Sequence, residues 1–398
     1  MGAGDSADAT APRLVFLGAG FSRPAGLPLA NELLERTLRE LEHFQAETHV
    51  HWALEEYLDY VQGTTGKSRL TLEQVKIEDF IGYLDNQHYF GMLGSDTWSS
   101  AGNRPQLLLR WGIGRVLHKS TPDPLPDLYV RFAEKLRPGD VVVTFNYDLV
   151  VERALEVVGT PYRRFPSRFE EVRGTHAFGS PQIDSTEVLV SKLHGSIDWV
   201  NRARFEEGLD YMRATSGAEG EAHWREHDPI FGDNPIVTTR LLVDGPRFEG
   251  DPLNKIAVVN DLDTYYETYE MWWRYPPMIL APSQAKQFYG EPFRELWDGM
   301  AGSGLLWGAF SIVGYSLPDA DPYTKQVLYE IGRSYAYGRE NPEARLAPMS
   351  RIKVVDKRDH ATAPDLYDGY RFLPSEHTDF LIDGFDEEAL EVLFREGG

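Results

Sequence analysis

The chain has 398 residues, of which 42% are hydrophobic and 12% aromatic, so it can bury a sizeable core and does not have the composition of a disordered chain. Its formal net charge of −22 repels a nucleic-acid backbone, which argues against direct nucleic-acid binding. It contains no cysteine, which excludes disulfides, thiolate nucleophiles and cysteine-based zinc sites.

The chain begins with a small, polar segment over residues 1–12, which we expect to be a flexible tail. This segment lacks the apolar core of a signal peptide. No run in the sequence approaches the roughly 20 apolar residues that a membrane helix needs. We therefore expect a cytoplasmic protein with no membrane association.

Residues 13–20, RLVFLGAG, predict a buried strand that ends in a glycine turn, and a helical pattern follows. Gly18 and Gly20 would let the backbone approach a ligand closely, and amides near a helix start can face phosphate oxygens. Arg23 stands where the dinucleotide fingerprint has its third glycine, so a plain tight turn is the alternative. Ser22 would either donate to phosphate or cap the turn.

A mostly helical module is predicted over residues 45–137, and a second buried strand over residues 139–148, GDVVVTFNYD. The helix that follows should end at Gly159. Asn146 and Asp148 lie two positions apart, so in an extended segment they point the same way. Their amide and carboxylate can bind ribose hydroxyls, an amide ligand or a water. For Asp148, capping of the next helix is the alternative.

Residues 187–200, EVLVSKLHGSIDWV, predict a third strand that runs into a loop. His194 would lie at the rim of the sheet, where it can take a proton, although a lone histidine often has a structural role. Ser196 and Asp198 are too close to it in sequence to form a hydrolytic triad, and no nucleophile elbow precedes them. Residues 201–275 have poor periodicity and predict a long irregular insertion.

Three further strands are predicted, over residues 276–283, 310–321 and 350–359. Helical patterns follow each of them. Gly314 and Ser316 repeat the features of the first glycine turn at another strand end. Asp356 can accept hydrogen bonds from a ribose diol, and a solvated strand terminus is the alternative.

Strands alternate with helices, and several strands are continuous apolar runs. This pattern predicts an α/β fold, a Rossmann-like parallel sheet with helices on both faces, with a helical insertion at 45–137 and an irregular insertion at 201–275. We interpret residues 13–398 as a single domain. Ligands of such sheets bind beyond the carboxyl ends of the strands. The strand ends GAG, TFNYD, LHGS, GYS and VDKRD should therefore meet along one edge.

In this order, the segments GAGFSRPAGLP, TFNYD, KLHGSIDW, GYSLPDAD and VVDKRD resemble sirtuin-like domains, in particular the divergent bacterial branch known from antiphage defence. The resemblance spans about residues 13–360. It implies that NAD is bound as a substrate and that Asn146 and His194 are catalytic. It further implies that NAD is bound by Gly18, Ala19, Gly20, Phe21, Ser22, Thr144, Asp148, Gly314, Ser316 and Asp356. No metal is expected, because the chain has no cysteine and its histidines show no ligand spacing.

The reaction that the resemblance implies is cleavage of the nicotinamide–ribose bond to give nicotinamide and ADP-ribose, as an antiphage effector that depletes NAD. Asn146 would position the water or the ribose, and His194 would act as general base. Deacylating sirtuins carry a four-cysteine zinc module and an Asp-Phe-Arg sequence after the glycine loop, and this chain has neither. A module that senses NAD or ADP-ribose without turnover, and a protein deacylase or ADP-ribosyltransferase, remain as alternatives.

Because a freely active NAD hydrolase would poison its host, we expect the activity to be gated. The resemblance implies a homo-oligomer, or a separate partner such as a HerA-like ring ATPase. The segments 45–137 and 201–275 are the candidate contact surfaces.

Overall fold

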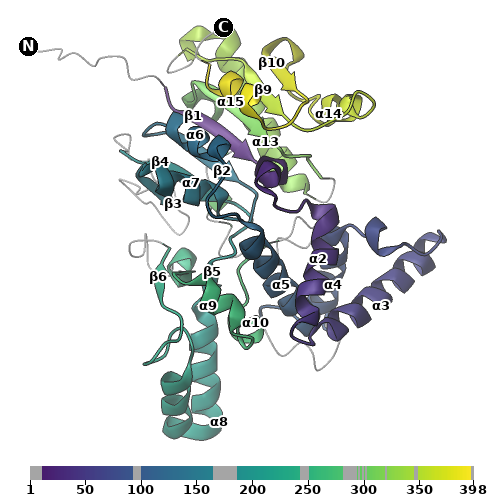
Figure 1. The fold of residues 1–398 in the computed structure, drawn as a ribbon, viewed down its shortest axis with the longest axis vertical. Helices are drawn as coiled ribbons and strands as arrows, with labels where there is room; N and C mark the ends of the chain where they lie inside the picture. The colour runs from purple at the N-terminus through teal and green to yellow at the C-terminus, as the bar shows by residue number, and fades with distance from the viewer. Residues whose placement is uncertain are drawn as a thin grey trace, which may run out of the picture.

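The structure is a computed structural model that describes residues 11–92, 100–164, 186–242, 251–280, 303–318, 321–344 and 348–395, together with 294, 296, 297 and 300. Its centre is a seven-stranded parallel sheet in the order β10-β9-β8-β1-β2-β4-β3 (Figure 1). The strands are β1 (Arg13–Leu17), β2 (Val141–Thr144), β3 (Tyr162–Arg164), β4 (Val188–Lys192), β8 (Ala309–Val313), β9 (Ile352–Val355) and β10 (Thr378–Leu381).

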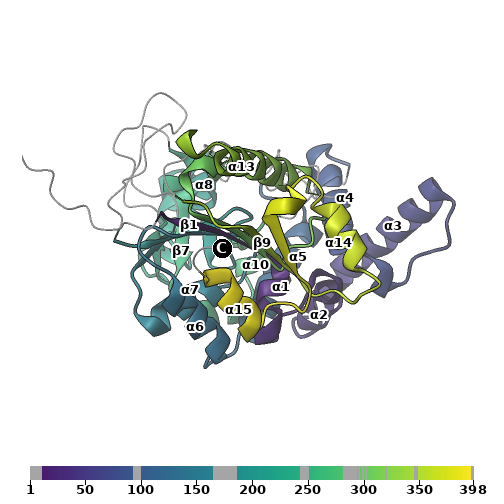
Figure 2. The same ribbon diagram turned by 90° about the horizontal axis from the view of Figure 1, so that it is seen from above.

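Helices cover both faces of this sheet, as the continuous apolar strands require. Seen from above, α13 (Pro322–Glu340) lies on one side, and α6 (Asp127–Lys135), α7 (Val150–Val158) and α15 (Glu387–Phe394) lie on the other (Figure 2). Alternate residues of β1 enter different cores: Leu14 and Phe16 face one, and Val15 and Leu17 face the other. The expected Rossmann-like sheet is therefore confirmed.

The order in which the strands are added to the sheet reverses at β1. The chain moves from β1 to β2 and β4 on one side, and later to β8, β9 and β10 on the other. Strand β1 pairs in parallel with both β2 and β8. Open α/β sheets bind ligands at such a switch point, beyond the carboxyl ends of the strands.

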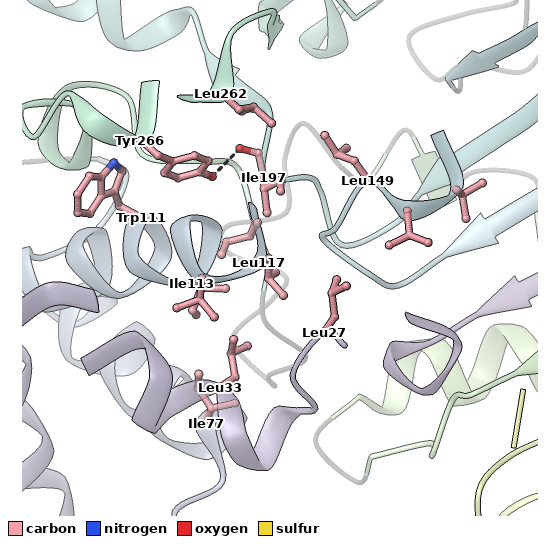
Figure 3. Close-up of a cluster of buried hydrophobic side chains, with 14 of the residues drawn as sticks. Leu27, Leu33, Ile77, Trp111, Ile113, Leu117, Leu149, Ile197, Leu262 and Tyr266 are labelled. Carbon is pink, nitrogen blue, oxygen red and sulfur yellow. Dashed lines mark hydrogen bonds between the residues drawn. The ribbon is translucent and has the colours of Figure 1, made fainter. Parts of the chain in front are cut away.

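Within the described residues of 45–137, helices make up most of the segment, as the sequence predicts. The helices α3 (Glu47–Thr65), α4 (Ile77–Tyr89) and α5 (Arg104–Ser120) lie in this segment, and α2 (Ala30–Glu42), which precedes it, packs with them; we refer to these four helices as the helical module. Buried side chains of α5 pack against α2 and also against the loops that follow β2 and β4, where Leu149 and Ile197 lie (Figure 3). The module and the sheet therefore share one hydrophobic core.

The expectation of an irregular insertion over 201–275 is wrong. The segment holds α8 (Ala203–His227), α9 (Leu262–Glu267) and α10 (Met271–Arg274), and its strands β6 (Thr239–Leu241) and β7 (Ile256–Val259) join β5 (Trp199–Asn201) in an antiparallel sheet. Gly217, at φ 65° and ψ −155°, breaks α8 into two parts. Because the helical period restarts at Gly217, the sequence shows no continuous apolar stripe over this segment. The two parts pack together, with Gly208 against the ring of Trp224.

One other predicted strand differs from the structure, and one observed strand was not predicted. Residues 276–280 form only an isolated bridge, Gly195 with Ile279, because Pro276 and Pro277 interrupt the segment; residues 281–283 lie outside the described part. Strand β10 at the sheet edge was not predicted, since only one of its four residues is buried. The described C-terminal region also contains α14 (Ala363–Gly369).

Other expectations fall on parts of the chain that are not described. Residues 1–10 of the expected tail lie outside the described residues, as does most of 292–302 in the helix expected over 292–309. The described end of that segment holds only a short 3-10 helix, Ser303–Leu306, before β8 begins at Ala309. Of the helices that the structure describes, none is long and apolar enough to span a membrane.

Candidate active site

Two glycine loops meet at the switch point between β1 and β8. The amide of Gly18 donates to the carbonyl of Val313 at 2.9 Å, and the amide of Gly20 donates to the carbonyl of Gly314 at 2.8 Å. A Cβ atom at Gly18 would lie 2.5 Å from the Gly314 oxygen, and one at Gly20 would lie 2.7 Å from the Gly314 Cα. Gly314 itself has φ +66°, which favours glycine. The loops therefore pack backbone against backbone, and side chains cannot be inserted between them.

A cavity of about 840 Å³ opens beside these loops at the carboxyl ends of the strands. Its volume is in the range of small-molecule sites. Residues from segments far apart in the sequence meet here, as predicted. The predicted site residues in its lining are Ala19, Gly20, Ser22, Asn146, Asp148, His194, Gly314, Ser316 and Asp356.

Three predicted residues lie behind the lining instead. The carbonyl of Gly18 accepts a hydrogen bond from Asn146. The Phe21 ring packs against Tyr129 and other aromatic rings below the loop. The hydroxyl of Thr144 accepts the backbone amide of Asn146 at 3.0 Å. These residues support the cavity wall rather than form it.

Asn146 is held in one orientation by the β1 loop. Its Nδ2 atom donates to the carbonyl of Gly18 at 2.9 Å and to the hydroxyl of Ser22 at 3.1 Å. A carbonyl only accepts, so the atom that faces Gly18 must be the amide nitrogen. The orientation of the Asn146 side chain thus follows from the geometry of the glycine loop.

Asp148 both lines the cavity and caps a helix, so the two interpretations of this residue are compatible. Its Oδ1 atom accepts the amide of Val150 at 3.1 Å, at the start of α7. Burial raises the pKa of the Asp148 carboxyl, and the nearby ammonium of Lys192 opposes this rise. Lys192 also donates to the backbone carbonyl of Asp148 and lies 3.2 Å from Glu152.

His194 is buried and paired with a carboxylate that sequence reasoning missed. Its Nε2 atom lies 3.1 Å from Oδ2 of Asp321. Oδ2 also accepts the hydroxyls of Tyr315 at 3.1 Å and Thr324 at 2.6 Å, while Oδ1 accepts the Thr324 amide. The Phe145 ring lies 5.2 Å from the imidazole. Asp321, itself fixed by several donors, therefore orients the imidazole. In the sequence, Asp321 stands directly before Pro322, which predicts that it caps the start of α13 but not that it pairs with His194.

The far end of the cavity lies beyond β9. Asp356 lines it, and the guanidinium of Arg358 lies 2.9 Å from the Asp356 Oδ2 atom. Burial raises the pKa of Asp356, and Arg358 opposes this rise. Lys357 and residues 383–386, after β10, also line this end, and neither was predicted.

The last wall comes from the helical module. From α4 and α5 the lining includes Ile77, Glu78, Ile81, Ile113 and Leu117. None of these was predicted as a site residue. Among the described residues, the cluster suited to a metal is Glu340, Glu376 and His377, which is outside the lining.

Comparison with known proteins finds a family similarity for the part of the chain that contains three of the predicted site residues. The family model of the SIR2-like domain matches residues 140–222, which contain Asn146, Asp148 and His194. This part of the chain is therefore similar to the SIR2-like domain, as the motifs within it indicate. No curated protein matches the chain.

Two solved structures are similar to the chain at low identity. One is Sir2Tm bound to a propionylated peptide, at 12% identity and a TM-score of 0.29, over 97% of this chain and 93% of that chain. The other is SIR2 in complex with the inhibitor EX-527, 2'-O-acetyl-ADP-ribose and a deacetylated p53 peptide, at 10% identity and a TM-score of 0.28, over 96% of this chain and 90% of that chain.

The contact between the glycine loops predicts a stability difference between two alanine variants. Gly314→Ala should lower the thermal midpoint strongly, since the new Cβ meets the backbone of Gly20 and Phe21. Gly159→Ala is the control, because Gly159 also has positive φ, +75°, but nothing within 4 Å of a Cβ. Gly159→Ala should lower the free energy of unfolding only by the cost of placing alanine in the left-handed conformation, about 1–2 kcal/mol. Equal losses in both variants would contradict the close approach.

Proposed function

We propose that the chain is an NAD hydrolase, which cleaves the nicotinamide–ribose bond and releases nicotinamide and ADP-ribose. The observation that carries the proposal is that Asn146 and His194 line one cavity beside two closely packed glycine loops. The match of residues 140–222 to the SIR2-like domain supports an NAD-utilising site.

The chemistry of this reaction fits the residues of the cavity. As the C1'–N bond breaks, nicotinamide leaves as a neutral group and positive charge moves to the ribose. The oxygen of a water then bonds to C1', and the water loses a proton. In the proposal Asn146 positions the ribose or this water, and His194 hydrogen-bonds the ribose hydroxyls and receives the proton. Asp321, next to the His194 ring, stabilises the imidazolium that forms.

The remaining predicted residues would bind the rest of the dinucleotide. Gly20 and Gly314 allow the pyrophosphate to approach the backbone, and Ser22 and Ser316 offer hydroxyl donors. Asp356, at the end of β9, would bind the adenosine ribose. These assignments follow the resemblance to sirtuin-like proteins.

A sensor that binds NAD without turnover is the second candidate. The buried pair of His194 and Asp321 favours the hydrolase, because binding alone does not require an oriented proton acceptor. A deacylase or ADP-ribosyltransferase would consume NAD only with an acylated peptide, or would add mass to a protein target. Incubation of the protein with NAD alone, followed by detection of free nicotinamide, separates these functions.

Asn146→Ala and His194→Ala should each abolish NAD cleavage in the folded protein. Loss of a general base typically costs 10²–10⁴-fold in rate. His118→Ala is the matched control, since His118 also pairs with an aspartate, Asp263 at 2.8 Å, but lies outside the cavity. Nicotinamide release is measured by chromatography, and folding by the thermal midpoint. Wild-type turnover in both site variants would exclude these two roles.

Asp321→Asn should lower kcat by at least tenfold and leave KM nearly unchanged, because the imidazole loses the carboxylate that orients it. The pH dependence of kcat should shift as well, since the imidazolium is no longer stabilised by a charge. A purely structural role of Asp321 predicts a different result: a lower thermal midpoint and weaker ADP-ribose binding, with an unchanged pH profile.

We also propose that the hydrolase acts in antiphage defence and is gated by self-assembly, with a HerA-like ring ATPase as the alternative gate. Under self-assembly, NAD turnover per molecule should rise with protein concentration, in parallel with the mass measured by light scattering. Constant turnover per molecule across concentrations would exclude this gate, and adding the ATPase would then test the other.

A further inference from the structure

Glu78 places a carboxyl group in the cavity from outside the sheet. It is the second residue of α4, and α4 and α5 otherwise contribute isoleucine and leucine side chains to the lining. Among the described residues from these two helices in the lining, Glu78 alone is ionisable. The wall is therefore apolar with one carboxyl group in it.

Glu78 and His194 line the same cavity. The link is Tyr147, which stands between Asn146 and Asp148 and also lines the cavity. Burial raises the pKa of the Tyr147 hydroxyl, and the charges of Glu78 and Asp321 add to this rise. The hydroxyl donates to the carbonyl of Leu280 at 3.0 Å, and the Leu280 amide donates to the carbonyl of His194 at 2.8 Å.

The surroundings of Glu78 favour a cationic partner. Burial raises the pKa of its carboxyl, and the neighbouring charge of Asp79 adds to the rise while Lys76 opposes it. A carboxylate against an apolar wall is costly unless a positive charge faces it. Asp79 lies in the same first turn of α4, but it is exposed and does not line the cavity. Both acids can therefore stabilise the start of α4, but only Glu78 of the two lines the cavity.

We infer that Glu78 is a further catalytic residue, whose carboxylate faces the cationic nicotinamide riboside end of NAD. This inference rests on the proposed function. The positive charge begins on the pyridinium ring and moves to the ribose as the C1'–N bond breaks. A fixed carboxylate at this end binds the cationic ring and then stabilises the charge on the ribose. The helical module thereby supplies part of the chemistry as well as a wall.

The first test compares Glu78→Gln with Asp79→Asn. Each variant removes one charge from the first turn of α4 without changing side-chain size. Glu78→Gln should lower kcat for NAD cleavage on the order of 10- to 100-fold, whereas Asp79→Asn should keep wild-type kcat. Affinity for ADP-ribose, which lacks the cationic ring, should not change in either variant. If Glu78→Gln does not fold, Glu78→Asp moves the carboxylate by one methylene and should give a smaller loss of kcat.

The second test measures binding and does not depend on turnover. Carba-NAD keeps the cationic ring and resists cleavage, whereas NADH has a neutral ring of nearly the same shape. The wild type and Asp79→Asn should bind carba-NAD more tightly than NADH, and Glu78→Gln should lose most of this preference. If the wild type binds both but cleaves no NAD, the hydrolase proposal fails, and this ratio still tests Glu78. An unchanged ratio in Glu78→Gln would overturn the inference.

Discussion

The close backbone contact between the loops after β1 and β8 determines where the other site residues lie. Gly18 and Gly20 contact Gly314 at distances that exclude side chains. The Gly18 carbonyl then orients Asn146, and on the other side Tyr315, directly after Gly314, holds the carboxylate that orients His194. Both catalytic candidates are thus positioned by residues that depend on one contact. A shift of either loop would move Asn146 and the His194 pair relative to each other.

Buried charges behind the cavity fix the loop after β2. Lys192, the last residue of β4, bonds the backbone of Asp148 and pairs with Glu152, which lies near Arg164. Arg164 in turn pairs with Asp198. Removing one member of such a buried pair leaves an uncompensated charge and costs about 3–5 kcal/mol. The network therefore gives the Asn146–Asp148 segment a rigid support that does not itself enter the cavity.

Sequence reasoning predicted the parts of the site that follow strands, and it missed the parts that other elements bring in. The end of an apolar strand can be recognised in the sequence. Asn146, His194 and Asp356 were predicted on this basis, and all three line the cavity. Asp321 reaches His194 from a helix start 127 positions later, and its local pattern indicates only a cap. Glu78 lies in an amphipathic helix whose periodicity shows which residues are buried, not which cavity they line. Contacts between distant segments carry no local signal.

The shared core explains how the helical module can influence the site through its apolar wall. Ile113 and Leu117 of α5 line the cavity and belong to the same hydrophobic core as Leu149 and Ile197, which lie in the loops after β2 and β4 (Figure 3). Tyr266 extends this connection by donating to the carbonyl of Ile197 at 2.7 Å. Since protein cores are close-packed, α4 and α5 cannot shift without moving these loops or opening a void. A partner that displaced the module would therefore alter both the apolar wall and the segments that carry the catalytic candidates, which is the requirement for a gate that acts from outside the cavity.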